Sequence, residues 1–96
     1  MTKQFTYTYE EDRKDSISFE YSPDADEKLA TSVENGIPFV YLNRSGMITL
    51  AKVLIKMASG SYSDGFHVHL HENFDADALE KLVVLLSPEE TKTEST

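Results

Sequence analysis

The chain has 96 residues, which is enough for one domain around a single core and too few for two. It contains no cysteine, so disulfides, thiol nucleophiles and thiolate metal sites are excluded. The 17 acidic residues outnumber the 9 Lys and Arg residues, giving a formal net charge of -8. This charge argues against nucleic acid as a partner, because phosphate binding depends on Lys and Arg. The acid excess favours a basic partner, or else serves solubility.

The beginning of the chain lacks the apolar core of a signal peptide. No window approaches the roughly 20 apolar residues of a membrane span. We therefore expect a cytoplasmic protein that does not bind membranes.

Two alternating segments open the chain. FTYTY (residues 5–9) and SISFEY (residues 16–21) alternate apolar with polar residues, which is typical of strands with one buried face. The charged residues between them suit the loop of an antiparallel hairpin. The side chains expected to face the core are Phe5, Tyr7, Tyr9, Ile17, Phe19 and Tyr21. Pro23 and the acids around it end the second strand in a loop.

A second hairpin is predicted around the Asn-Gly pair at residues 35–36, because both central residues of a type I′ turn need a positive φ. In this register Glu34 faces Ile37, and Val33 faces Pro38. The second pair is a non-hydrogen-bonded one, so the missing N–H of the proline costs the ladder nothing.

From Ser45 the apolar residues recur at helical spacing. Asn43 or Ser45 can cap the start of this helix, and Gly60 is placed to end it in the left-handed conformation. Lys52 and Lys56 are expected on the outer face. The predicted buried stripe consists of Met47, Leu50, Ala51, Leu54, Met57 and Ala58.

Strict alternation resumes in FHVHLH (residues 66–71), with Phe66, Val68 and Leu70 expected in the core and three histidines on the other face. An acidic loop follows, and then KLVVLLS, which is apolar on both faces as in a central strand. Residues 88–96 contain no apolar side chain and are predicted to form a disordered acidic and polar tail.

The predicted element order is therefore ββββαββ, a single α+β domain over residues 1–87. About six strands form a mainly antiparallel, curved sheet packed on one helix in two layers. One helix covers only one face of such a sheet. The other face is partly apolar, at Val83 and Leu85 among others. We expect it to be an interaction surface, or to be buried by curvature or by homodimerisation.

Two short motifs lie between residues 43 and 86. The helix motif is carried by Gly46, Leu50, Ala51 and Leu54, the strand motif by Gly65, Phe66, His67, His69 and Leu70, and the acidic loop by Asp75 and Asp77. With these residues the segment resembles a family of small bacterial immunity proteins of polymorphic toxin systems. Members of that family carry a helix of the GLLSLAKILLKLA type, a GFHFHL strand, an acidic loop and a last apolar strand. The resemblance covers a little under half of the chain, and the N-terminal hairpins carry no motif of the family.

The resemblance implies a protein that binds a co-produced toxin tightly and blocks it, with no reaction of its own. Many such toxins are basic nucleases, and a chain with a net charge of -8 would be steered to a basic face.

The three histidines raise a separate possibility. Neighbours in the series project the same way about 6.6–6.8 Å apart, so one pair can converge on a metal ion. His67 and His71 would stand about 13 Å apart and cannot share one ion. Glu20 or Glu72 could supply a further ligand to a pair that includes His69. This face is therefore a metal site, a pH-sensing cluster or a partner-facing strand surface.

Catalytic motifs are missing from the sequence. Its nucleophile candidates are hydroxyls, no serine lies in G-x-S-x-G, and the four glycines are too scattered to form a phosphate loop. We expect no enzymatic activity and no cofactor. The leading hypothesis is an immunity protein, monomeric or homodimeric, that contacts its toxin through His67, His69, His71, Glu72, Asp75 and Asp77. The alternatives are a metal-binding protein or metal-dependent hydrolase built on the histidine strand, and a structural homodimer.

Overall fold

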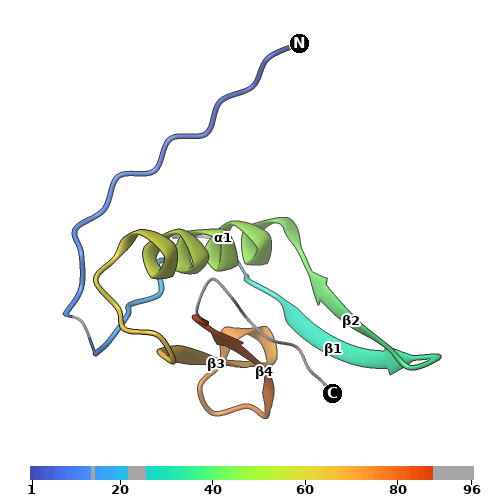
Figure 1. Ribbon diagram of the computed structural model, residues 1–96. Coiled ribbons are helices and arrows are strands. Elements are labelled where there is room, and N and C mark those ends of the chain that lie inside the picture. The colour runs from blue at the N-terminus through green and yellow to red at the C-terminus, as the bar shows by residue number, and fades with distance from the viewer. Residues whose placement is uncertain (14, 22–25, 88–96) are drawn as a thin grey trace.

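The computed structural model describes residues 1–13, 15–21 and 26–87. Its elements are β1 (Leu29–Glu34), β2 (Ile37–Leu42), α1 (Arg44–Ser59), β3 (His67–His71), the short 3-10 helix η1 (Glu72–Phe74) and β4 (Glu80–Leu85). β1 pairs with β2 and β3 with β4, both antiparallel, as two separate two-stranded sheets. Helix α1 lies above the β3–β4 hairpin, and the β1–β2 hairpin extends to the side (Figure 1). The predicted α+β class is confirmed.

The predicted number of strands is wrong, since the described residues form four strands in two sheets instead of six in one curved sheet. Residues 5–9 and 16–21 are not assigned to strands. A local contact explains part of this outcome: the Asp12 carboxylate accepts the backbone N–H of Ser18 at 2.9 Å, which is a donor that a neighbouring strand would otherwise use. The expected loop at Pro23 and the tail at 88–96 lie outside the described residues.

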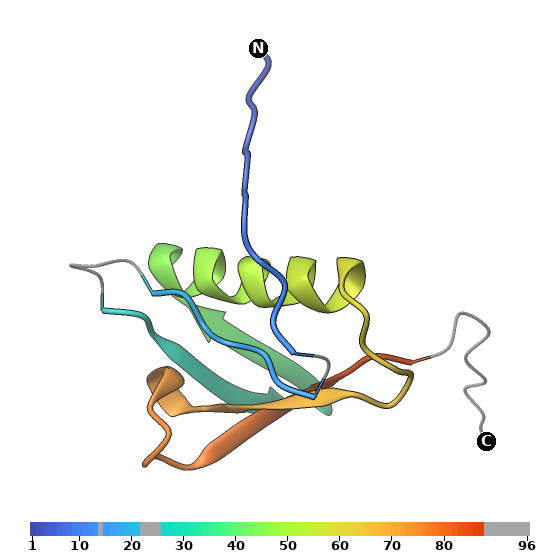
Figure 2. The same cartoon turned by 90° about the vertical axis from the view of Figure 1, so that its left-hand side faces the viewer.

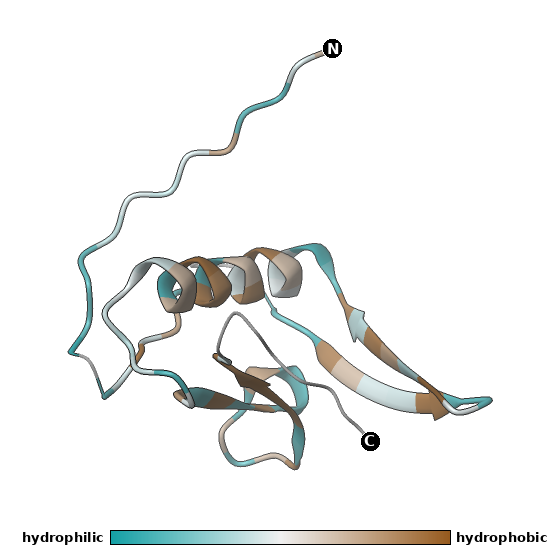
Figure 3. Cartoon of the chain, viewed as in Figure 1, coloured by the Kyte–Doolittle hydropathy of each residue, from teal (hydrophilic) through white to brown (hydrophobic). Residues whose placement is uncertain are grey.

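The turn between β1 and β2 confirms the predicted register. Asn35 and Gly36 have φ values of 55° and 77°, and the pairs Glu34 with Ile37 and Val33 with Pro38 form as expected. The Asn-Gly pair supplies the two positive φ values that a type I′ turn needs. The hairpin is exposed over most of its length, and Val33 is 72% exposed. Figure 3 shows that both of its strands contain hydrophobic residues.

Helix α1 begins as predicted and ends differently. The Asn43 side chain accepts the backbone N–H of Gly46 at 2.8 Å, which caps the first turn. Gly60 donates its N–H to the Lys56 carbonyl but has an extended backbone, with φ of -88° and ψ of -172°, so the predicted left-handed ending is wrong. The chain leaves the helix directly into the connector that leads to β3.

The buried face of α1 is rotated by about one residue from the predicted stripe. Its buried residues are Gly46, Thr49, Val53, Lys56 and Met57, whereas Met47, Leu54 and Ala58 are exposed. Polar partners make this rotation possible, because buried polar groups need hydrogen bonds or opposite charges. The Thr49 hydroxyl donates to Glu27 at 3.2 Å, and the Lys56 ammonium contacts two carboxylates.

The core lies between α1, β3 and the segment 15–21. Val53, Met57 and Val68 are buried together, and the half-buried side chains packed on them are Ile17, Phe19, Phe66, Val84 and Leu86. Figure 2 shows residues 15–21 on the same side of α1 as β3. The predicted inward face of β3 is confirmed, since Val68 and Leu70 are buried. Phe5 and Tyr21, which were expected in the core, are 58% and 48% exposed.

The outer face of the β3–β4 hairpin is uncovered. The pairs His67 with Leu85 and His69 with Val83 share this face, and Val83 and Leu85 are 43% and 54% exposed. β4 is therefore an edge strand with one wet face, and the expected central strand is wrong. Within the ranges that the structure describes, no helix has the length and apolarity needed to cross a membrane.

Candidate functional site

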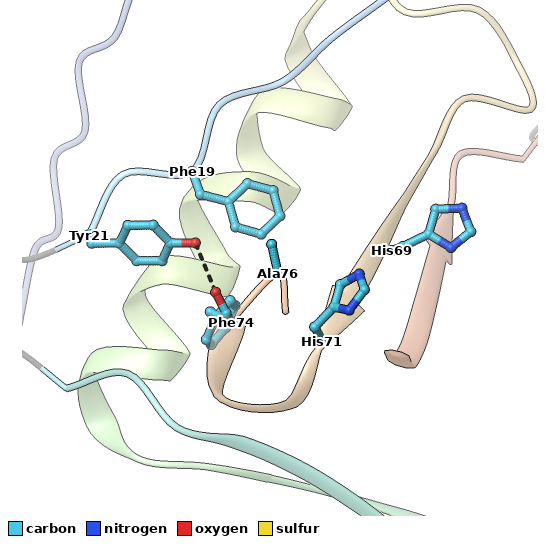
Figure 4. A pocket seen from close by; sticks show the side chains of 6 residues that line it. All are labelled: Phe19, Tyr21, His69, His71, Phe74 and Ala76. Carbon is cyan, nitrogen blue, oxygen red and sulfur yellow. Dashed lines mark hydrogen bonds between the residues drawn. The ribbon is translucent and has the colours of Figure 1, made fainter. Parts of the chain in front are cut away.

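A pocket of about 290 Å³ lies between residues 19–21, β3 and the loop that follows η1 (Figure 4). Its walls are made by Phe19, Tyr21, His69, His71, Phe74 and Ala76. Three aromatic rings and two imidazoles thus surround a space large enough for a side chain of a partner.

Phe74 holds the aromatic wall together. Its ring centre lies 6.2 Å from that of Phe19 and 6.2 Å from that of Tyr21, both edge to face. The Tyr21 hydroxyl donates to the Phe74 carbonyl at 3.5 Å, the dashed line in Figure 4. Phe74 also has a positive φ of 59°, a conformation that costs an L-residue about 1–2 kcal/mol. Strained residues of this kind cluster at ligand-binding sites.

The preceding residue, Asn73, fixes the loop to the rest of the molecule. It has a φ of 55°, and its side-chain oxygen accepts the backbone N–H of Leu29 at 3.1 Å. Leu29 is fully buried, so the contact ties the loop to the start of β1.

Each of the three histidines has its Nδ1 atom next to an oxygen. The Nδ1 atom of His67 lies 3.1 Å from the Gly65 carbonyl, that of His69 lies 2.9 Å from the Glu80 carboxylate, and that of His71 lies 2.8 Å from the Ala78 carbonyl. Carbonyl and carboxylate oxygens accept hydrogen bonds, so Nδ1 carries the proton in each ring. In a neutral ring Nε2 then keeps its lone pair.

The first two histidines form a pair. The ring centres of His67 and His69 are 4.9 Å apart, closer than the 6.6–6.8 Å that separates alternate residues along a strand, so the rings lean together. Both residues are exposed, whereas His71 is half-buried at the end of β3. A bulge between Leu70 and His71 sets His71 opposite Glu80.

The loop beside the pocket is acidic. Glu72, Asp75, Asp77 and Glu80 lie within nine residues that contain no Lys or Arg. Asp75 and Asp77 are exposed, and the backbone N–H of Asp77 donates to the Asp75 carboxylate at 3.0 Å. The hydrogen bond from His69 holds the pKa of Glu80 below its ordinary value, so this carboxylate stays ionised at neutral pH.

Glu20, the sequence-predicted further metal ligand, lies elsewhere. Its carboxylate pairs with the Lys56 ammonium at 2.9 Å, and Asp12 joins the same ammonium at 3.4 Å. The hydrogen bond from Lys56 lowers the pKa of Glu20. Burial alone would lower the pKa of Lys56, but the hydrogen bond and charge of Glu20 outweigh it and raise that pKa.

The structure therefore brings together only part of the predicted site. His69, His71 and the acidic loop meet at the pocket. His67 lies two residues before His69 at the start of β3 and does not line the pocket. In residues 1–13, 15–21 and 26–87 no three His, Asp or Glu side chains are placed to hold one metal ion.

Sequence reasoning missed Phe74 and Glu80 and assigned the exposed Tyr21 to the core, whereas Phe19 packs on the core as expected and also lines the pocket. Phe74 carried a signal, because it is an aromatic residue inside an otherwise polar run. Glu80 carried none, because its position depends on the register of a hairpin with an irregular loop.

Comparisons of the chain with protein-family models, with curated proteins and with solved structures gave no match.

Proposed function

We propose that this protein is a non-catalytic binding module, specifically an immunity protein that binds and neutralises a basic toxin domain. The observation that carries the proposal is the aromatic pocket beside the acidic loop. Ring faces and carboxylates together favour one kind of occupant, an arginine or lysine side chain of the partner.

The physical case for that occupant has two parts. A cation over an aromatic face is stabilised by about 0.5–2 kcal/mol, the larger value applying when water is excluded. The carboxylates of Asp75 and Asp77 are exposed on either side of Ala76, a pocket residue, and can pair with the same cation. An aromatic pocket that anchors one long side chain is the usual form of an interface hot spot.

The uncovered face of the β3–β4 hairpin would extend the contact. His69 belongs both to this face and to the pocket, and Val83 lies opposite it. The exposed apolar side chains there would be desolvated by a partner, while the net charge of -8 speeds its approach from solution.

The test is calorimetric titration of the chain with the toxin domain encoded beside it, together with cell survival on co-expression. We expect tight binding by the wild type. The variant Phe74→Ala, which removes the central ring, and the double variant Asp75→Asn/Asp77→Asn should each weaken binding roughly tenfold or more.

A matched control removes the same two charges elsewhere. Glu10→Gln/Asp15→Asn changes two exposed acids of the N-terminal stretch, and should alter affinity by no more than a few fold. Equal losses in the two double variants would show that net charge, not the pocket, drives binding. No binding by the wild type would overturn the proposal itself.

A further inference from the structure

We propose that His67 and His69 form half of a zinc site, which a second copy of this chain completes. The proposal rests on the exposed histidine pair and is tested without a toxin, although a second copy would cover the same face of the β3–β4 hairpin that extends the proposed toxin contact.

The first support is the hydrogen-bond partner of Nδ1 in each ring. In proteins, a metal-binding histidine nearly always donates its other ring N–H to a carboxylate or carbonyl, which fixes the tautomer and increases the basicity of the ligating nitrogen. His69 has this arrangement with Glu80 at 2.9 Å, and His67 has it with the Gly65 carbonyl at 3.1 Å. Nε2 remains for a metal in both rings.

The second support is the distance between the rings. Two imidazoles bound to one tetrahedral zinc through Zn–N bonds of about 2.0–2.1 Å have ring centres about 5 Å apart. The observed separation of 4.9 Å matches that value. Imidazole ligands also favour zinc over magnesium and calcium, which prefer oxygen.

The pair by itself is incomplete, because structural zinc takes four protein ligands. No third His, Asp or Glu joins the pair in the described part of the chain. The pair is exposed and lies opposite Val83 and Leu85, which are 43% and 54% exposed on the same face. A second copy that brings its own His67 and His69 supplies the two missing nitrogens and covers these apolar side chains.

The experiment uses the full chain without a polyhistidine tag, freed of metal with a chelator. Zinc is titrated by calorimetry near neutral pH, and the mass in solution is followed by sedimentation velocity. We expect one zinc per two chains and a monomer-to-dimer shift that the chelator reverses. His67→Ala and His69→Ala should each weaken zinc binding roughly tenfold or more and remove the dimer.

His71→Gln is the matched control, because the described residues bring no third ligand to the His67–His69 pair and the Nδ1 atom of His71 faces the Ala78 carbonyl, so this variant should bind zinc like the wild type. Magnesium in place of zinc should give neither heat nor dimer. The proposal would be overturned if the wild type bound no zinc, or bound it as a monomer. It would also be overturned if His71→Gln lost zinc binding while His67→Ala kept it.

Discussion

Lys56 shows that a residue which helical periodicity places on the surface can be buried in the fold. It was expected on the outer face of the helix, yet its side chain is only 3% exposed. Its ammonium reaches the Glu20 carboxylate at 2.9 Å, the Asp12 carboxylate at 3.4 Å and the Ser18 carbonyl at 3.0 Å. These contacts join the segment before β1 to α1.

Replacing Lys56 by Met should therefore destabilise the fold. Met keeps the apolar stem but leaves two carboxylates without their cation. Breaking a fully buried ion pair costs about 3–5 kcal/mol, and the partial exposure of Asp12 and Glu20, at 24% and 40%, reduces the expected loss to about 1–3 kcal/mol. Urea denaturation measures this difference in the free energy of unfolding.

The control for that variant is Lys28→Met. Lys28 pairs with Asp26 at the same 2.9 Å, but both side chains are more than half exposed. Such a surface pair contributes about 0–1 kcal/mol. Similar losses in the two lysine variants would contradict the structural role assigned to Lys56.

At the scale of elements, the start of α1 shows why the helix has its observed orientation. Asn43 caps the helix through Gly46, accepts the backbone N–H of Lys28 at 2.9 Å, and donates to the Asp26 carbonyl at 2.7 Å. Gly46 lies against this junction, and a Cβ atom there would come within 2.5 Å of the Lys28 carbonyl oxygen. The close approach of the two backbones depends on glycine at this position.

Gly46→Ala should thus destabilise the protein by about 1–3 kcal/mol, even though alanine favours a helix interior by about 1 kcal/mol. Ala58→Gly, at an exposed position near the end of the same helix, should lose up to about 1 kcal/mol through propensity alone. Thermal or urea unfolding of both variants separates the two effects. If Gly46→Ala raised the free energy of unfolding, the Lys28 backbone would have to move away from the new methyl group without loss of stability.

Elements set by local residues were predictable from the sequence. The Asn-Gly turn, the Asn43 cap and the inward face at Val68 and Leu70 each depend on a short stretch of chain. The buried face of α1 was not predictable, because it depends on partners such as Glu27 for Thr49, which are distant in sequence. A prediction from hydrophobic periodicity places polar residues such as Thr49 on the solvent-exposed side of the helix.

The candidate site also has some features that were predictable from the sequence and others that were not. Strand alternation placed the histidines on one face, and the acidic residues were evident from the sequence. The pocket was not predictable, since it requires Tyr21 to turn outward and meet Phe74 across a gap of 53 positions. The Nδ1 partner of His69 likewise depends on the bulge that sets the register of β3 and β4.

At the scale of the whole molecule, exposed apolar side chains accompany a strong negative charge. Val33, Ile37 and Tyr41 on the β1–β2 hairpin and Met47 and Leu54 on α1 are all more than 40% exposed. Where exposed apolar side chains form a contiguous patch, that patch is typical of a surface that binds another protein. A net charge of -8 opposes association between copies that expose such side chains.

The charge distribution also predicts how stability depends on pH. The pKa of Asp12 is lowered by the hydrogen bond from the Ser18 N–H, that of Glu20 by Lys56, and that of Glu80 by His69. Ordinary carboxyl pKa values are about 4, so below about pH 5 the unfolded chain takes up protons before the folded one. Stability should therefore fall as the pH drops through the lowered values.

Stability should also fall at alkaline pH (the alkaline limb), and its cause there differs from that of the loss at acid pH (the acid limb). Burial, and after it the neighbouring Glu20 carboxylate, raises the pKa of Tyr7 to about 12. The unfolded chain, with a tyrosine pKa of about 10, loses its proton first, so stability should fall as the pH rises from about 10 through about 12.

Urea denaturation across the pH range measures both limbs. Glu20→Gln should flatten the acid limb, because it removes one of the depressed carboxyls, and should also weaken the alkaline limb, because Glu20 helps to raise the pKa of Tyr7 and of Lys56. Tyr7→Phe should flatten the alkaline limb, incompletely, because burial also raises the pKa of Tyr21 and Tyr62. An acid limb unchanged in Glu20→Gln would mean that the pair between Glu20 and Lys56 does not contribute to folding.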